Sequence, residues 1–170
     1  FSYGAIPQTF EDASQKESLK SYDKSYPTNQ KYGGDGDPLD ILLINDRQKR
    51  KIGQVVRVIV IGIFPMIDDN EIDWKLIAVA SPSRNLSSKI KINIPDSKLE
   101  LYRLWFQHYK DKVQNNQLIS GGVQISHNMG PKVASKVIKH CQNQYQQIIQ
   151  EQHHNNPKNI KLYNSFQVLE

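Results

Sequence analysis

The sequence predicts a single α+β domain of 170 residues. Three apolar runs come first, over residues 39–44, 53–63 and 74–79, and they are rich in the Val and Ile that favour strands. Two segments with apolar residues at intervals of three and four follow, over about 97–110 and from about 131 onward. Strands followed by helices, without a repeated βαβ unit, are typical of α+β proteins.

The segments between the predicted strands are expected to be turns and loops. Residues 1–12 mix aromatic residues with Gly and Pro, so we expect an extended segment with turns. Residues 13–34 are rich in Ser and Lys and weakly periodic, which predicts a long surface loop. Residues 69–72 are expected to form a four-residue hairpin loop, which would set Asp68 opposite Asp73.

The two predicted helices have different boundary signals. Ser97 and Glu100 have the spacing of a capping box, which starts the first helix near residue 97. The second helix is predicted to begin near Pro131 and to carry a Gln/Asn-rich outer face, with His153 and His154 just beyond its end. Residues 160–169 are expected to add a terminal strand or a docked tail.

Composition excludes several classes of protein. No apolar run approaches the roughly 20 residues of a membrane span, so no membrane partner is predicted. The single Cys141 excludes an internal disulfide framework and a four-cysteine zinc site; it fits a reducing compartment, and we expect a cytoplasmic protein. The basic residues are scattered, apart from Arg47, Arg50 and Lys51, so nucleic acid is not expected as a partner.

The acidic residues gather in two windows. Seven of the 17 Asp and Glu residues lie in residues 35–40 and 68–73, which contain no Lys or Arg. The rest of the chain is therefore more basic than the formal net charge of +5 suggests. Converging carboxylates without nearby His or Cys favour Mg²⁺, or Mn²⁺ as a substitute, over zinc. The alternative interpretation is that both windows are solvated acidic turns. The four acids that we expect to bind metal are Asp35, Asp40, Asp68 and Asp73.

Cationic and phenolic residues accompany these acids. Lys75 follows Asp73 by two residues and should share its strand face, and Tyr109 and Lys110 end the first predicted helix. An anionic substrate bridged by metal ions needs carboxylates for the ions and donors for its outer oxygens. The pattern therefore favours a phosphate-bearing substrate.

Four stretches of the chain resemble soluble inorganic pyrophosphatase of family I, in that family's order. They are YGAIPQTFED (3–12), which is most like the eukaryotic branch, DGDPLD (35–40), IDDNEIDWKLIAV (67–79) and WFQHYK (105–110). The D-x-D-P-x-D hexamer is the signature of the family. After Lys110 the chain departs from the family, because Asp-Lys-Val-Gln-Asn replaces a longer loop with Pro and Gly.

The resemblance implies a small closed β-barrel (OB-like) with flanking C-terminal helices. It implies Mg²⁺-dependent hydrolysis of pyrophosphate to two phosphates by direct attack of a metal-activated water. By position, Asp37 would be the general base, and the four acids named above would hold the metal ions. Tyr3, Lys75, Tyr109 and Lys110 would contact substrate oxygens.

The same resemblance sets expectations for the organisation of the protein. Residues 1–170 would form one pyrophosphatase domain that lacks the family's N-terminal segment, which supplies further acidic and basic residues to the site. The chain resembles the eukaryotic branch, whose members form homodimers, so the resemblance implies a homodimer. The alternative is a non-catalytic, pyrophosphatase-like remnant that acts as a folded or dimerising module.

Overall fold

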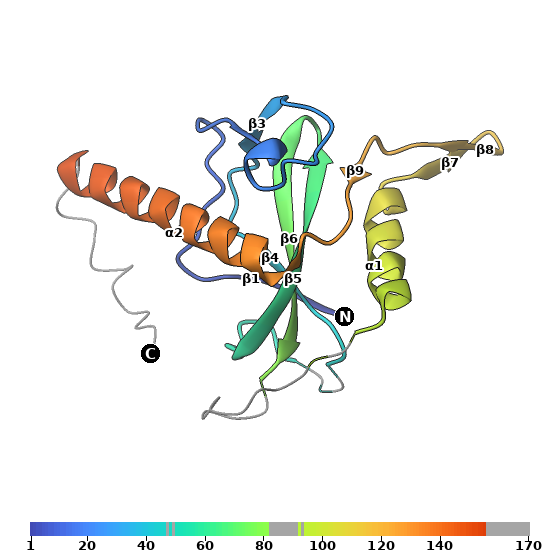
Figure 1. Cartoon of the computed structure of the whole chain (residues 1–170), viewed down its shortest axis with the longest axis horizontal. Coiled ribbons are helices and arrows are strands. Elements are labelled where there is room, and N and C mark those ends of the chain that lie inside the picture. The colour runs from blue at the N-terminus through green and yellow to red at the C-terminus, as the bar shows by residue number, and fades with distance from the viewer. Residues whose placement is uncertain (47, 49, 82–91, 93, 156–170) are drawn as a thin grey trace.

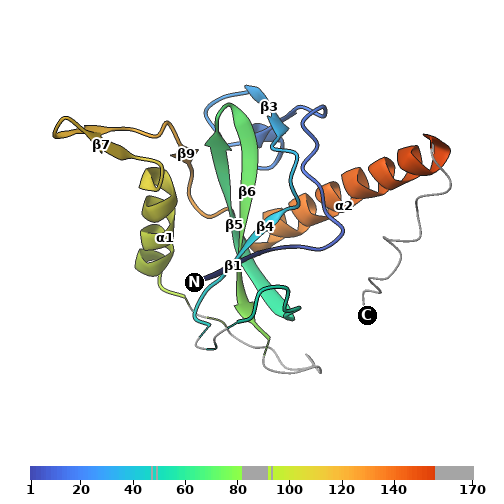
Figure 2. The same cartoon turned by 180° about the vertical axis from the view of Figure 1, so that it is seen from behind.

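The protein is described here from a computed structural model, which describes residues 1–46, 48, 50–81, 92 and 94–155. A β-sheet forms the centre, helix α2 (Gly130–Asn155) crosses one of its faces, and helix α1 (Asp96–His108) stands beside it (Figures 1 and 2). In the described part of the chain, no helix is both long and apolar enough to cross a membrane.

The sheet is open. Its strands run in the order β1-β4-β6-β3-β2, and β5 pairs with β6 and β9. The bounds are β1 Ser2–Ala5, β2 Glu17–Ser18, β3 Lys31–Gly34, β4 Asp40–Leu43, β5 Val58–Asp68, β6 Glu71–Ala80 and β9 Gln124–Ile125; β7 (Lys112–Gln114) and β8 (Gln117–Ile119) form a separate hairpin.

The expected closed barrel is therefore wrong, whereas the α+β class and the two C-terminal helices are confirmed. A barrel closes only when every strand has a neighbour on both sides. Among the described residues β1 pairs with β4 alone and β9 with β5 alone, so the ring of hydrogen-bonded strands is not complete.

The predicted strands are present with shifted limits. The run at 39–44 forms β4, and the run at 74–79 lies within β6. The strand expected over residues 53–63 lies later in the chain, because β5 begins at Val58 and continues to Asp68. Strand β5 extends beyond residue 63 because its later residues pair with β6, as far as Asp68 opposite Glu71.

The turn between β5 and β6 is shorter than expected. Asp69 and Asn70 have positive φ values of 49° and 67°, as in the tight two-residue turns that match the twist of a hairpin. Asp68 therefore pairs with Glu71, and Asp73 pairs with Met66, so the expected Asp68–Asp73 pairing is wrong.

The apolar residues divide between the two faces of the sheet. Along β6, Ile72, Trp74, Leu76 and Ala78 belong to a core cluster that includes residues of α2, whereas Ile77 belongs to a second cluster that includes Phe106 of α1. This division follows the alternation of side chains along a strand. The odd-numbered residues at this end of β6, Asp73 and Lys75, consequently share the face that α1 approaches.

Both predicted helices form, but their boundaries differ from the expectation. Helix α1 begins at Asp96, and its N-cap is Pro95 without a side-chain hydrogen bond, so the Ser97 capping box is wrong. Helix α2 begins at Gly130, where the Asn128 Oδ1 accepts a hydrogen bond from the Gly130 N–H at 3.0 Å. His153 and His154 lie within α2 and not beyond it. The expected element at residues 160–169 lies outside the described residues.

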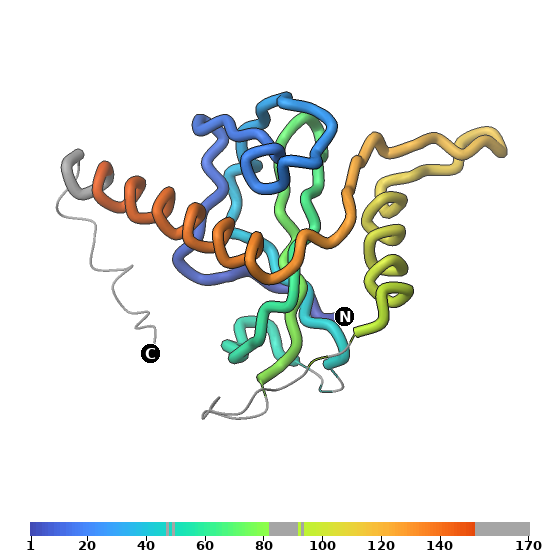
Figure 3. Tube along the Cα trace, viewed as in Figure 1, coloured from blue at the N-terminus to red at the C-terminus, as the bar shows by residue number. Residues whose placement is uncertain are grey.

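Residues 13–34 are more ordered than a surface loop. They include β2, a short 3₁₀ helix (Leu19–Ser21) and β3, and they fold over the β5–β6 turn (blue in Figure 3). Leu19 and Tyr32 are buried in the core, and the ring of Tyr22 packs edge-on against Trp74, 5.0 Å between centroids. The loop interpretation is therefore wrong, because scattered apolar residues in this polar stretch provide tertiary contacts.

Gly34 is required by a close backbone approach. A Cβ atom at this position would lie 2.3 Å from the carbonyl oxygen of Glu11. We expect Gly34→Ala to lower the free energy of unfolding by about 1–3 kcal/mol, as overpacking of a core does. Denaturant unfolding will measure the change.

Gly4→Ala is the matched control for this substitution, because a Cβ at Gly4 would make an ordinary 3.8 Å contact with Ile41. Equal stability of the two variants would contradict the close approach at Gly34.

Candidate functional site

Strand register gathers the predicted charged residues on one face of the sheet. Asp40 of β4 pairs with Lys75 of β6, and Met66 of β5 pairs with Asp73. Directly paired residues of neighbouring strands project to the same face, and alternate residues along one strand do the same. Asp40, Asp68, Asp73 and Lys75 therefore share one face.

The buried Lys75 is the centre of an ion-pair network. Its Nζ lies 2.6 Å from Asp40 Oδ2, 2.6 Å from Asp73 Oδ1 and 2.8 Å from the Tyr3 hydroxyl. The Tyr3 hydroxyl in turn donates to Asp40 Oδ2. The prediction that Lys75 and Asp73 share a strand face is thus confirmed, and Tyr3 and Asp40 join the same group.

The charge of Lys75 is stabilised by these partners. Burial alone would lower the pKa of Lys75, but the charge of Asp73 and the hydrogen bonds to Asp40, Asp73 and Tyr3 outweigh it and raise the pKa. Burial, followed by the hydrogen bond to Asp40, also raises the pKa of Tyr3. Lys75 is therefore a fixed cation and Tyr3 a neutral hydrogen-bond donor at neutral pH.

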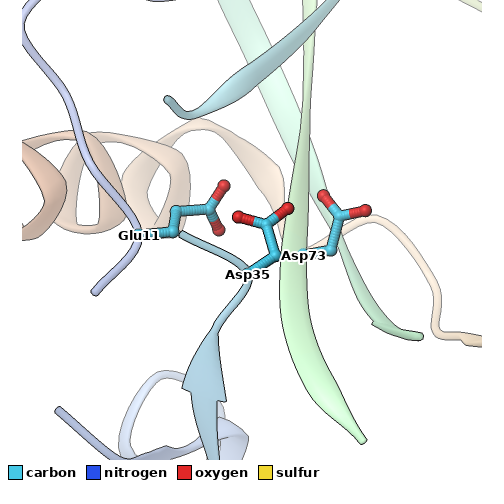
Figure 4. Close-up of side chains that lie close together, drawn as sticks. All are labelled: Glu11, Asp35 and Asp73. Carbon is cyan, nitrogen blue, oxygen red and sulfur yellow. The ribbon is translucent and has the colours of Figure 1, made fainter. Parts of the chain in front are cut away.

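A cluster of three carboxylates lies beside this network. One oxygen each of Glu11, Asp35 and Asp73 lies within 4.8 Å of the others, and the three side chains approach one another in Figure 4. Glu11 is only 3% exposed, and its Oε1 accepts the backbone N–H of Trp74 at 3.1 Å. The cluster therefore joins three separate parts of the chain.

Burial makes ionisation of these acids unfavourable. Burial, with the charge of Asp35 next, raises the pKa of Glu11 well above its usual value. Burial also raises the pKa of Asp35, and it raises the pKa of Asp73 to about 6 although Lys75 opposes the shift. Closely spaced, desolvated carboxylates of this kind favour either bound protons or a bound cation.

Backbone hydrogen bonds hold the acidic hexamer against residues 6–11. The Glu11 N–H donates to the Asp37 carbonyl at 2.9 Å, and the Ile6 N–H donates to the Leu39 carbonyl at 2.8 Å. The buried Thr9 Oγ1 accepts the Leu39 N–H at 3.0 Å. These bonds explain how Glu11 reaches the hexamer, while Asp37 itself is exposed.

A second group lies at the end of β5. The Tyr109 hydroxyl donates to Asp68 Oδ2 at 3.0 Å, and the Lys110 Nζ lies 2.6 Å from the same oxygen and 3.1 Å from Asp69 Oδ2. Burial, followed by the bond to Asp68, raises the pKa of Tyr109, and the bond to Asp68 raises the pKa of Lys110. Tyr109 and Lys110 thus meet Asp68, which lies 41 residues before Tyr109 in the chain.

The residues present fit a hard divalent cation. The three clustered donors are all carboxylate oxygens, which Mg²⁺ and Mn²⁺ prefer. Among the described residues, Glu11 Oε2 is buried and has no hydrogen-bond partner, which leaves it available as a ligand atom. Asp35 and Asp73 are the predicted metal ligands within this cluster, whereas Asp40 contacts Lys75 and Asp68 contacts Tyr109 and Lys110.

Glu11 is a site residue that sequence reasoning missed. It lies in the quoted stretch 3–12, but outside both acidic windows, and no role was predicted for it. The available signal was the pair of adjacent acids, Glu11 and Asp12, at the end of an otherwise uncharged stretch. Its approach to Asp35 and Asp73 depends on the backbone pairing of residues 6–11 with the hexamer, which local sequence does not reveal.

The acidic cluster leads to a prediction about stability and pH. Without divalent ions, we expect the free energy of unfolding to decrease as the pH rises from about 4 to 7. A carboxyl whose pKa is higher in the folded state binds more protons when folded, so its stabilising effect is greatest below the unfolded pKa and is lost as pH rises through the folded pKa. The shift of Asp73 from 3.8 to about 6 corresponds to roughly 3 kcal/mol, with Glu11 and Asp35 acting in the same direction.

Urea unfolding at several pH values, in EDTA and in Mg²⁺, will test this dependence. Mg²⁺ should raise stability most at neutral pH, where the carboxylates are ionised. Asp73→Asn serves as the control, because it removes one of the titrating groups and should flatten the dependence in EDTA. An unchanged pH dependence in that variant would contradict the assignment.

Comparison with known proteins agrees with this arrangement. The family model for inorganic pyrophosphatase matches residues 1–146. A probable inorganic pyrophosphatase of Plasmodium falciparum is 39% identical over 115 residues, which cover 65% of this chain and 29% of that protein. An inorganic pyrophosphatase of Kluyveromyces lactis is 32% identical over 155 residues, which cover 86% of this chain and 48% of that protein. The chain thus spans about half or less of the length of these relatives.

Solved structures give the same result. The type I inorganic pyrophosphatase of Toxoplasma gondii superposes with a TM-score of 0.66 at 27% identity, covering 87% of this chain and 61% of that one. An N-terminally truncated vacuolar soluble pyrophosphatase of Trypanosoma cruzi, in complex with PPi, has a TM-score of 0.59 at 28% identity. The match covers 88% of this chain and 53% of that one. With the family model matched over most of the chain, this chain belongs to the inorganic pyrophosphatase family, as its four motifs predicted.

Proposed function

We propose that the protein hydrolyses inorganic pyrophosphate to two phosphates with Mg²⁺, and that Mn²⁺ can substitute. The observation that carries the proposal is the carboxylate cluster of Glu11 and Asp73, which are buried, and Asp35, which is half-buried, beside the fixed cation of Lys75. The pyrophosphate complex of the related Trypanosoma cruzi protein supports the choice of substrate.

The carboxylates on this face are proposed to hold the metal ions. Asp35 and Asp73 would act with Glu11, and the predicted ligands Asp40 and Asp68 would complete the set from positions next to Lys75 and Lys110. When bound, divalent ions lower the pKa of a coordinated water and neutralise charge on phosphate oxygens. The raised pKa values of the unmetallated acids are consistent with a site that needs cations to stay ionised.

The protein's own groups would orient the substrate and move one proton. Lys75 and Lys110 would donate to phosphate oxygens, and Tyr3 and Tyr109 would supply neutral hydroxyl donors. Asp37 would accept a proton from water as the water oxygen bonds to one phosphorus. The bridging P–O bond then breaks, and the second phosphate leaves with the electron pair. Asp37 is exposed and bound through its N–H to Asp35 Oδ1 at 2.9 Å, which fixes the backbone of the general base beside the acidic cluster.

Phosphate release from pyrophosphate will test the proposal. The assay compares Mg²⁺ with EDTA, using residues 1–170 and any longer chain that the same gene encodes. We expect release that depends on Mg²⁺. If neither protein releases phosphate, the hydrolase proposal is overturned, and the alternative of a non-catalytic, folded or dimerising module is favoured.

We further propose that residues 1–170 form a single pyrophosphatase domain and that the protein is a cytoplasmic homodimer. Cys141 is free and buried, which is consistent with the proposed compartment. Sedimentation analysis will determine the oligomeric state, and fluorescence microscopy of the tagged protein in cells will determine its location.

A further inference from the structure

Three side chains connect α1 and the turn after it to residues 121–125. The Arg103 Nη1 donates to the Ile125 carbonyl at 3.2 Å, the Gln107 Nε2 donates to the Val123 carbonyl, and the Asp111 Oδ1 accepts the Gly121 N–H at 2.7 Å. We call these three bonds the 103–107–111 ladder. Four residues of helix rise about 6 Å and two residues of an extended chain about 6.6 Å, so the spacings on the two sides match.

The last bond of the ladder lies next to Lys110. Gly121 approaches so closely that a Cβ there would lie 2.3 Å from the Cβ of Lys110 and 2.7 Å from its carbonyl carbon. The other oxygen of Asp111, Oδ2, lies 2.8 Å from the His108 Nδ1. Asp111 therefore joins the end of α1 to the base of the β7–β8 hairpin, with Lys110 between them.

The ladder also fixes α1 relative to the strand that carries Asp68. Ile125 belongs to β9, which pairs with Met66 of β5, two residues before Asp68. The Lys110 Nζ reaches Asp68 Oδ2 at 2.6 Å, so the connection from α1 through β9 and β5 returns to Lys110. Any shift of residues 121–125 along α1 would move Lys110 relative to Asp68.

We propose that the 103–107–111 ladder positions Lys110 for pyrophosphate and that Asp111 is its decisive positioning residue. The assignment rests on the proposed function, in which Lys110 contacts a phosphate oxygen. Asp111 itself is engaged on both oxygens, and its side chain is 9% exposed, so it acts through Lys110 and does not bind substrate.

The test is a double-substitution cycle on the full chain, combining Asp111→Ala with Lys110→Ala. In the wild-type background, Asp111→Ala should raise the KM for Mg²⁺–pyrophosphate about tenfold and change kcat less than about threefold, as loss of uniform binding does. In the Lys110→Ala background it should have no further effect. Gly121→Ala should reproduce the rise in KM, whereas Asp111→Asn, which keeps an oxygen acceptor, should retain most of the affinity.

Asp96→Ala is the matched control, an equivalent change at the opposite end of α1, and should leave KM unchanged. The same four proteins of the cycle are also compared by thermal unfolding, which detects the Asp111–Lys110 coupling without substrate. An equal rise in KM in both backgrounds, or an unchanged KM in folded Asp111→Ala, overturns the positioning role. If the wild type neither binds nor hydrolyses pyrophosphate, the proposed function fails. Non-additive changes in melting temperature among the four proteins would then still support the coupling between Asp111 and Lys110, and additive changes would overturn it.

Discussion

Lys75→Met is expected to lower both the stability and the activity of the protein more than any other single change on this face. Methionine keeps most of the volume of the lysine but removes the charge between Asp40 and Asp73. Removal of one partner from a buried ion pair leaves an uncompensated charge and costs about 3–5 kcal/mol. In EDTA at neutral pH, we therefore expect the free energy of unfolding to fall by this amount.

Mg²⁺ should recover part of the lost stability in Lys75→Met, because a bound cation offsets the carboxylate charge. It should not recover hydrolysis, which we expect to fall by about 10²–10³-fold because a donor to the substrate is lost. Urea unfolding and phosphate release, each with and without Mg²⁺, will measure the two effects.

Lys112→Met provides the control, since Lys112 is an exposed residue of β7. Its stability and activity should stay close to those of the wild type. A Lys75→Met protein with wild-type stability in EDTA would show that Lys75 does not compensate the acidic face.

Asp37→Asn is expected to separate catalysis from stability. Asp37 is exposed, and its backbone N–H and carbonyl, which bind Asp35 and Glu11, are unchanged by the substitution. We expect a change in unfolding free energy within about 0.5 kcal/mol. Loss of a general base should lower kcat by about 10²–10⁴-fold.

Initial rates of phosphate release at saturating Mg²⁺ will measure the effect of Asp37→Asn, with calorimetry of Mn²⁺ binding as a second measurement. Asp23→Asn is the control, because it makes the same chemical change at an acid that has no role in the proposed site and whose side chain accepts the Ser25 N–H. Substantial activity in Asp37→Asn would exclude Asp37 as the proton acceptor, and a parallel loss of Mn²⁺ binding would make it a ligand instead.

The site could be predicted from sequence where its geometry depends on neighbours along the chain. Asp73 and Lys75 are two residues apart on a strand, so their contact follows from strand alternation. Tyr109 and Lys110 directly follow a helix whose apolar period is visible in the sequence. The closed barrel that the resemblance implied did not follow for these residues, because closure depends on pairing between distant strand edges.

The sequence by itself determined the α+β class, the principal strands and helices, the two acidic windows and the pyrophosphatase motifs. These features depend on residue types at short spacing, which local backbone periodicity translates directly into faces and turns. Only the tertiary structure decided that Glu11 joins Asp35 and Asp73, that Lys110 meets Asp68, and that the described sheet stays open. The physical reason is that distances between remote residues are set by strand register, close backbone approach and helix packing, which no short stretch of sequence contains.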